Sequence, residues 1–528
     1  MPVTPVTAYD LYWNGTLTKD FNGDIGSPED KPPRWIKDED GTVTLHNVAI
    51  TRDPRQDVSD YFINGFNASD KNLNIEWAWD KSWGDPRQMG VVRSDVDTLK
   101  IEAKNFSLKA SFESPDPARG EWNNKGLFAD RGVGSIELSA SETIYLETGH
   151  FPIFADPGTI KITDFTKLTA VATGLQEGSG YVVRNVAEGG SPSIIRIVGT
   201  PNSSIDLISQ KSHSSKKLTA VVEDASKEGE GTLITGGSIS IQRTAKEPHS
   251  IVLTAHSGDE GHIDIEGNNS VTIGSRDDDF AVQGFSKKDG FSTIDINKTS
   301  KGKVVINGRT TAESAAVNIH YAGEKSLQNG DVLAAKSHPG AEDRFSKFDS
   351  GEPGTKTGSM KLVFSGSGSG MNGNMTAEEG SSVSADFSGD DVFFKGDITV
   401  RKGERFVDGE TSRVDVTAPG RNASLSGNVT IEDGGAFRAD ISGENAALGG
   451  NVSLTGGVLQ MSVFRGLHPS METSISKEAQ PTSRSTTGES GQAASTTRAV
   501  HPMSRSTEEA PGPAKHPSPT RLLLQTFS

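Results

Sequence analysis

Alternating apolar and polar residues dominate the chain from about residue 130 to residue 461. Short runs carry an apolar side chain at every second position, and Gly, Asn, Asp and Ser, which favour tight turns, separate the runs. In the middle of this region the alternating pairs are Ile239/Ile241, Ile251/Leu253, Ile263/Ile265, Val271/Ile273, Ile294/Ile296, Val304/Ile306 and Val317/Ile319. The pattern predicts many short β-strands, each with one face directed into a core.

These alternating runs recur about every two dozen residues. The steps from Ile239 to Ile263, from Val271 to Ile294 and from Ile294 to Val317 are 24, 23 and 23 residues. A recurring step of this size predicts one coil of a β-solenoid per step.

The clearest repeat lies near the end of the alternating region. The segment GNMTAEEGSSVSADFSG at 373–389 recurs as GNVTIEDGGAFRADISG at 427–443, and nine of the seventeen positions are identical. Glycines divide the offset of 54 residues into steps of 23 and 31, so we interpret it as two coils, the longer one with an extended loop. Apolar character is kept at period two while side-chain size changes, at Met375/Val429, Ala377/Ile431, Val383/Phe437, Phe387/Ile441 and Ile398/Val452. We predict that these side chains point inward into one shared core, in which a larger side chain in one layer is compensated by a smaller one in the next.

Length and composition favour one elongated stack over several globular cores. The chain has 528 residues, of which 59 are Gly and only 6% are aromatic, which suits a narrow layered core. There is no cysteine, which excludes disulfides, thiolate metal sites and thiol nucleophiles. The net charge is −17 and the Lys and Arg residues are scattered, which argues against nucleic acid or an anionic membrane as the partner.

The character of the sequence changes twice along the chain. All six tryptophans lie in the first 122 residues, so residues 1–130 are predicted to be an irregular, Trp-containing N-terminal cap region. Residues 131–461 are predicted to hold the β-helix repeats. From 462 to 528 the alternation stops and Ser, Thr and Pro dominate, which predicts a disordered tail. A frameshift near 462–466 is an alternative origin for this tail.

The coils that contain Gly-Asn-Val-Thr and the strands of the form xADxSG resemble the passenger regions of Gram-negative autotransporters, which are exported by type V secretion. The matching segments are 373–389, 396–403 and 427–461, and the stretch from GSISIQ to SVTIGS is similar in style. The resemblance implies an all-β, right-handed parallel β-helix exposed at the cell surface or the outer membrane. It also implies a stalk or adhesin that makes multivalent contacts with host or bacterial surface glycans or proteins.

Two parts of the autotransporter pattern are expected to be missing from the sequence as given. Its start, MPVTPVTAYDLYW, lacks the basic and apolar regions of a signal peptide, and no long series of barrel strands follows the repeats. No stretch approaches the ~18 consecutive apolar residues of a membrane-spanning helix. We therefore expect no membrane insertion by this segment and no translocator barrel within it.

Some β-helices are polysaccharide lyases or hydrolases, which is the alternative function. Such enzymes place clustered carboxylates on an exposed sheet face as general acid and base or as calcium ligands. The candidates here are Asp277, Asp278 and Asp279, and then Asp390 and Asp391. Each cluster follows a predicted strand next to Gly or Ser, where Asp is favoured as a turn residue, so the structural interpretation is preferred. No catalytic residue, cofactor site or metal site is predicted.

The tryptophan-rich segment WAWDKSW at 77–83 supports one sharper hypothesis. Alternation in a strand would place Trp77 and Trp79 on one face, where stacked indoles could contact a glycan. The preferred alternative is that Trp77, Trp79 and Trp83 cover the end of the stack as a hydrophobic cap.

Overall fold

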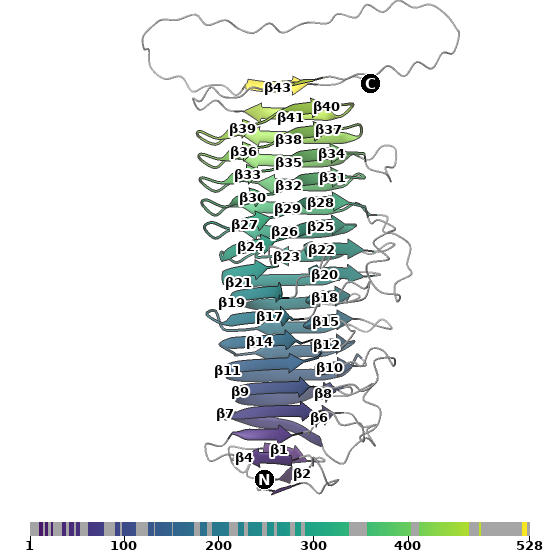
Figure 1. Ribbon diagram of the computed structural model, residues 1–528, viewed down its shortest axis with the longest axis vertical. Coiled ribbons are helices and arrows are strands. Elements are labelled where there is room, and N and C mark those ends of the chain that lie inside the picture. Colours follow the sequence, from purple (N-terminus) through teal and green to yellow (C-terminus); the bar gives the residue numbers. More distant parts are fainter. Residues whose placement is uncertain are drawn as a thin grey trace, which may run out of the picture.

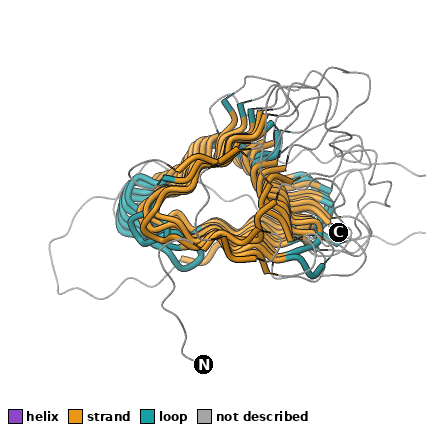
Figure 2. The backbone as a smooth tube through the Cα atoms, turned by 90° about the horizontal axis from the view of Figure 1, so that it is seen from below, coloured by secondary structure: helices purple, strands orange, loops and turns teal. Residues whose placement is uncertain are grey.

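The computed structural model is an all-β stack in which every regular element of the described residues is a strand. The described residues are 10–13, 16–18, 23–24, 34–37, 42–46, 49–52, 62–78, 90–94, 98–111, 125–130, 132–149, 151–173, 180–186, 193–210, 220–225, 231–244, 251–257, 261–274, 280–286, 291–336, 356–402, 411–463, 475–476 and 520–524. Strands lie one above another along the long axis (Figure 1), and the view along this axis has three sides (Figure 2). Among these residues there is no helix long and apolar enough to cross a membrane.

Each coil contributes strands to three parallel sheets in turn. Sheet 1 contains β7 (Phe62–Ala78), β9 (Thr98–Ser111), β11 (Ser135–Thr148), β13 (Thr159–Thr163), β16 (Ile194–Val198), β19 (Gly231–Arg243), β21 (His262–Ile273), β23 (Ser292–Ile296), β26 (Ala315–Tyr321), β29 (Ser359–Phe364), β32 (Ser382–Asp386), β35 (Ser412–Ala418), β38 (Gly435–Ile441) and β41 (Val458–Val463).

Sheet 2 follows sheet 1 in every coil. The long strands β7, β9, β11, β19 and β21 turn the corner, so their second halves also belong to sheet 2. Its other members are β5 (Val43–His46), β14 (Lys167–Ala172), β17 (Ser204–Ser209), β24 (Lys303–Asn307), β27 (Leu327–Asn329), β30 (Gly370–Asn372), β33 (Phe393–Lys395), β36 (Ser424–Ser426) and β39 (Ala447–Gly449).

Sheet 3 completes the coil before the chain returns to sheet 1. It contains β6 (Ala49–Arg52), β8 (Gly90–Ser94), β10 (Lys125–Asp130), β12 (Phe151–Asp156), β15 (Val183–Val186), β18 (Val222–Ala225), β20 (Ile251–Ser257), β22 (Phe280–Ser286), β25 (Arg309–Glu313), β28 (Val332–Ala335), β31 (Met375–Glu378), β34 (Ile398–Arg401), β37 (Val429–Ile431) and β40 (Val452–Leu454). Consecutive members of each sheet pair in parallel, which is the arrangement of a β-helix-like solenoid.

Antiparallel pairs lie at the two ends of the stack. At the N-terminal end β1 (Asp10–Trp13) pairs with β2 (Thr16–Thr18) and β7, and β4 (Arg34–Lys37) pairs with β3 (Gly23–Asp24) and β5. At the other end β43 (Thr520–Leu524) is antiparallel to β41, whereas β42 (Ile475–Ser476) continues sheet 3 in parallel with β40.

The 54-residue repeat corresponds to two coils, as predicted. Met375 pairs with Ile398, Ile398 pairs with Val429, and Val429 pairs with Val452. The successive steps along this column are 23, 31 and 23 residues, the same separations as those of the hydrogen bonds between neighbouring coils.

Two of the three coil steps predicted for the middle of the chain are wrong. Ile239 lies on sheet 2 and pairs with Val271, whereas Ile263 lies on sheet 1 and pairs with Ile294. Coils in this part have longer connections, so equal spacing of similar strands does not identify stacked partners. Only the step from Ile294 to Val317 joins residues that are paired in neighbouring coils.

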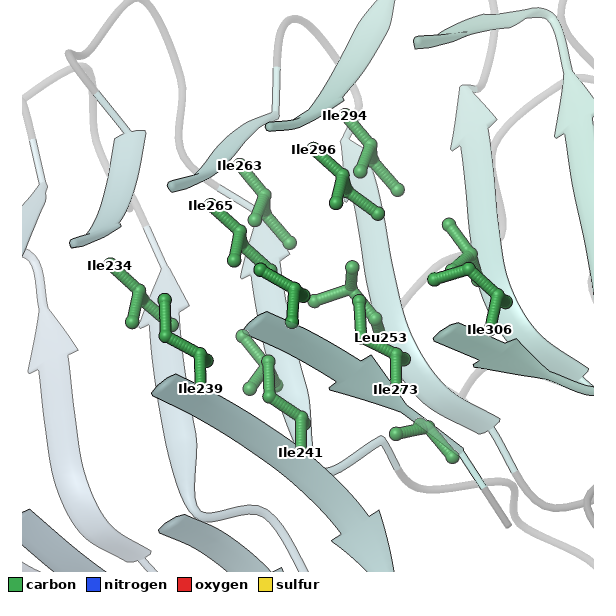
Figure 3. Close-up of a cluster of buried hydrophobic side chains, with 14 of the residues drawn as sticks. Ile234, Ile239, Ile241, Leu253, Ile263, Ile265, Ile273, Ile294, Ile296 and Ile306 are labelled. Atoms are coloured by element: carbon green, nitrogen blue, oxygen red, sulfur yellow. The ribbon is translucent and has the colours of Figure 1, made fainter. Parts of the chain in front are cut away.

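The predicted inward positions form one continuous hydrophobic core. Val429, Ile431, Phe437 and Ile441 are 2%, 0%, 0% and 1% exposed, and their counterparts in the sister segment are buried as well. Figure 3 shows the same arrangement in the middle of the stack, where isoleucines from successive coils point into the space between the sheets. Burial at every second position confirms the inward face that the alternation predicts.

The described structure bears on the predicted regions only in part. The ladder of β8, β10 and β12 passes residue 130 without a break, and parallel pairing already begins at β5 and β6. Most of 462–528 lies outside the described residues, so the predicted disorder of the tail, like the right-handed sense of the coil, stays a prediction.

Candidate functional site

A group of aromatic side chains separate from the main core lies on sheet 3 in the first half of the stack. Phe128 in β10 and Phe151 and Phe154 in β12 are 3%, 2% and 3% exposed, and Tyr181 and Val186 pack against them. The ring centroids of Phe128 and Phe154 are 5.4 Å apart, and those of Phe151 and Phe154 are 5.0 Å apart. These five residues form what we call the outer aromatic cluster.

Three cations lie over the rings of the outer aromatic cluster, and one of them is Arg93, whose guanidinium carbon is 5.3 Å from the ring centroid of Phe128. The Nζ of Lys125 is 3.5 Å from the ring centroid of Phe128 and 4.7 Å from that of Phe154. The guanidinium carbon of Arg184 is 5.5 Å from the ring centroid of Phe154 and 5.1 Å from that of Tyr181. Such contacts are attractive because the face of an aromatic ring is electronegative, and the attraction grows when water is excluded.

Carboxylates balance these cations. Arg184 donates a hydrogen bond from Nε to Oε2 of Glu223 at 2.8 Å, and the Glu223 side chain is only 5% exposed. Arg93 donates from Nη2 to Oδ2 of Asp130 at 3.2 Å. The cluster is therefore a largely buried network in which rings, cations and carboxylates alternate.

The electrostatics of the cluster shift the pKa values of Lys125 and Arg184 in opposite directions. Burial lowers the pKa of Lys125 to about 8, against the opposing attraction of Asp156 and Asp130. Burial is the largest single effect on Arg184 and disfavours its charged form, but the attraction of Glu223, Tyr181 and Asp156 together outweighs burial and raises the pKa of Arg184 above its ordinary value. A lysine that is partly neutral at slightly alkaline pH is the one strongly shifted amine in this group, and such shifts often mark functional sites.

The outer aromatic cluster was missed at the level of sequence. Its strands read KGLFA at 125–129 and FPIFA at 151–155, in which aromatic residues stand at positions that face away from the core. Near-continuous apolar runs of this kind are typical of strands covered on both faces. These apolar runs could have indicated that the outer face of the two strands is also buried. They could not have indicated which cations pack on that face.

Polar side chains form a second regular feature at the corner between sheets 2 and 3. The Oδ1 atom of each residue accepts a hydrogen bond from the backbone N–H of the next, at 2.8–3.2 Å, along Asp331, Asn374, Asp397, Asn428 and Asn451. We call these residues the corner ladder. Because Asn374 separates Asp331 from Asp397, no two carboxylates are adjacent within it.

The carboxylates considered for catalysis at 390 and 391 are turn residues with partners. Asp390 Oδ2 accepts a hydrogen bond from Nη2 of Arg421 at 2.7 Å, and this bond lowers the pKa of Asp390. Asp391 has a φ of 56°, and its Oδ1 accepts a hydrogen bond from Asn422, which has the same φ in the next coil. Asp and Asn tolerate this left-handed conformation better than most residues, so the geometry supports the structural interpretation.

The other candidates from the sequence are largely outside the described part of the chain. Trp77 lies in β7 opposite Ala110, but its side chain is not among those described, and Trp79 is outside the described residues. Asp277, Asp278 and Asp279 are also outside them. The glycan contact at Trp77 and Trp79 therefore stays a prediction.

Carboxylates also gather on sheet 1 around Asp264. Burial raises the pKa of Asp264, and the charges of Glu266 and Asp295 add to the effect. Glu266 accepts a hydrogen bond from the backbone N–H of Thr299, and Asp295 accepts one from Asn318. Within the described ranges no group of three or more His, Cys, Asp or Glu is arranged to hold a metal ion.

Together these features define a class: an extended β-solenoid with a continuous apolar core inside and regular polar ladders at its corners. No family model matches the chain, and neither a curated protein nor a solved structure matches it.

Proposed function

We propose that this chain is the passenger portion of an autotransporter-like protein, in which a right-handed parallel β-helix acts as a stalk or adhesive surface outside the cell. The partners would be glycans or proteins on host or neighbouring bacterial cells. The repeat sequences at 373–389 and 427–443 support this family, because their resemblance to passenger repeats is closest there.

The observation that carries the proposal is the unbroken parallel ladder of sheet 3 from β6 to β40. At ~4.8 Å per layer, this ladder spans roughly 60 Å of rigid rod. Because each coil contacts mainly its neighbours, such a rod places many similar surfaces along one direction without needing a single active site. Weak contacts repeated along it would sum through multivalency.

Binding to cells or glycans by the purified full chain, immobilised on beads, tests the proposal. The repeat allows an in-register variant in which Gly373 is joined directly to Asn428, which removes residues 374–427 and two coils. Multivalent adhesion predicts that this shortened chain binds more weakly but measurably.

A matched control is the deletion of one further residue, 374–428, which shifts every later strand by one position and turns its apolar face outward. This control should bind poorly because it misfolds. Complete loss of binding in the folded in-register variant would instead indicate one discrete site within the deleted coils. Release of unsaturated or reducing sugars from a polysaccharide panel by the full chain would contradict the adhesive function and favour the enzymatic alternative.

A further inference from the structure

Three consecutive coils stack an Asn-Gly dipeptide at the same corner. The dipeptides are Asn307-Gly308, Asn329-Gly330 and Asn372-Gly373, and each asparagine ends a sheet 2 strand, in β24, β27 and β30. Asn329 donates from Nδ2 to Oδ1 of Asn307 at 2.9 Å, and Asn372 donates from Nδ2 to Oδ1 of Asn329 at 3.1 Å. We call these three asparagines the asparagine column.

Asn-Gly is the dipeptide in which an asparagine most readily reacts with its own backbone. The backbone nitrogen of the glycine attacks Cγ of the asparagine side chain, the side-chain nitrogen leaves as ammonia, and a five-membered succinimide forms. Water then opens the ring at either carbonyl and yields aspartate or isoaspartate. The only co-reactant is water, and the glycine makes the attack easy because it has no side chain to obstruct the approach.

The stacked coils block this reaction at the attacking atom. The N–H of Gly308 donates to the carbonyl oxygen of Asn329 at 2.6 Å, and that of Gly330 donates to the carbonyl oxygen of Asn372 at 2.8 Å. The N–H of Gly373 likewise donates to the carbonyl oxygen of Lys395 at 2.9 Å. Each glycine N–H is thus bonded to the next coil, and this hydrogen bond has to break before the nitrogen can attack.

The column also holds the group that would be attacked. The side-chain amide of Asn329 is engaged at both ends, as donor to Asn307 and as acceptor from Asn372. The backbone of each asparagine is extended as part of a strand, whereas ring closure requires the side chain and the following nitrogen to turn toward each other. The hydrogen bond of the glycine nitrogen, the hydrogen bonds of the asparagine side chain and the extended backbone all depend on stacking. All three constraints are lost together when a coil separates from its neighbour.

We propose that Asn307, Asn329 and Asn372 form a latent deamidation site, which stays unreactive while the coils are stacked and reacts once a coil has opened. Aspartate or isoaspartate at these positions would therefore show that the coil had separated from its neighbour. An aspartate at 329 would place a carboxylate oxygen against Oδ1 of Asn307, where an N–H now donates. An isoaspartate would add a methylene to the main chain at a corner without spare room, since a Cβ on Gly330 or Gly373 would already collide with the carbonyl of the preceding coil.

Peptide mapping by mass spectrometry tests the site. The full chain is incubated at slightly alkaline pH in native buffer and in denaturing guanidinium, and aspartate and isoaspartate are quantified at 307, 329 and 372. We expect conversion in the native chain to be roughly 100-fold slower or more, because only the rarely open fraction of a core coil can react. Similar rates in the two conditions would overturn the proposal.

A pair of variants on β28 links the reaction to coil opening rather than to global unfolding. Val332 is fully buried in the coil between Asn329 and Asn372, whereas the next residue, Leu333, lies outside the core. Val332→Ala is expected to raise the native rate at 329 and 372 at least several-fold, while Leu333→Ala leaves it unchanged. Hydrogen exchange at Gly330 and Gly373 verifies opening, and faster exchange in Val332→Ala without faster deamidation would also overturn the proposal.

Discussion

Lys125 places an amine among phenylalanine rings, where its charged form has lost most of its hydration. A lysine whose folded pKa lies below its unfolded value of 10.5 destabilises the fold while it is protonated and ceases to do so as it releases its proton. Between pH 8 and 10.5 the unfolded chain therefore holds more protons than the folded chain, and stability rises with pH in this window.

The Lys125→Met variant should lack this pH dependence. The free energy of unfolding of the natural chain, measured relative to that of Lys125→Met, is expected to increase by about 3 kcal/mol across the window. Guanidinium unfolding at both ends of the window measures the difference. Parallel pH profiles in the two proteins would show that the amine is hydrated in the folded state.

Gly427 shows how closely the coils approach at the corner between sheets 2 and 3. Its φ is +145°, and a Cβ there would collide with the carbonyl oxygen of Gly396 in the preceding coil. Gly427→Ala is therefore expected to destabilise the fold by about 2–4 kcal/mol, because it combines backbone strain with a steric clash.

Gly449 is a matched control for this substitution. Its φ is not positive, and a Cβ there would meet nothing closer than the carbonyl oxygen of Leu425 at 4.0 Å. Gly449→Ala should change stability by no more than about 0.5 kcal/mol. Equal losses in Gly427→Ala and Gly449→Ala, measured by thermal or guanidinium unfolding, would contradict the close approach inferred at Gly427.

At the scale of elements, an aromatic stack joins three coils of sheet 1 inside the core. The ring centroids of Tyr321 at the end of β26 and Phe364 at the end of β29 are 4.4 Å apart, and those of Phe364 and Phe387 are 4.8 Å apart. The rings are nearly parallel, and all three residues are 0% exposed. Phe364 therefore contacts an aromatic ring both above and below it.

Truncating the central ring to a methyl group should cost more than replacing it with an aliphatic side chain of similar volume. Phe364→Ala is expected to destabilise the fold by about 3–5 kcal/mol, since it removes a buried ring and leaves a cavity between two others. Phe364→Leu should cost clearly less, because it keeps most of the volume. Comparison of the two variants by guanidinium unfolding checks this expectation, and equal costs would contradict it, because they would mean that the loss comes from the ring contacts and not from the cavity.

At the scale of the whole molecule, the 54-residue repeat makes the stack modular. Joining Gly373 to Asn428 brings β37 onto β28, so that Val332 is followed by Val429 in the same inward column. We expect this shortened chain to keep the circular dichroism of the natural one and to be shorter by roughly 10 Å, two layers of ~4.8 Å, in small-angle scattering. Loss of the β-sheet circular dichroism signal in this variant, but not in the natural chain, would show that the deleted coils are required for folding.

Alternation and the strong repeat at 373–389 and 427–443 were sufficient to predict strands, their inward faces and a stack. These properties are local: side chains alternate with period two in any strand, and burial selects the apolar face. Val429 and Phe437 were therefore identified as core residues before any stacking partner was known. The turn character of Asp390 and Asp391 was predictable for the same reason, because it depends on a few neighbouring residues.

Only the tertiary structure decided which strands lie on one another. Ile239 and Ile263 look equivalent in the sequence, yet they belong to different sheets. The lengths of the connections decide which strands stack on one another, and the residues of a strand do not determine how long the next connection is. The outer aromatic cluster and the asparagine column likewise join residues 22–43 positions apart across neighbouring coils, for example at 329 and 372. The sequence by itself determined the face that each strand buries. Stacking decided which side chains are in contact across neighbouring coils, because such a contact depends on the length and path of all the chain between the two residues.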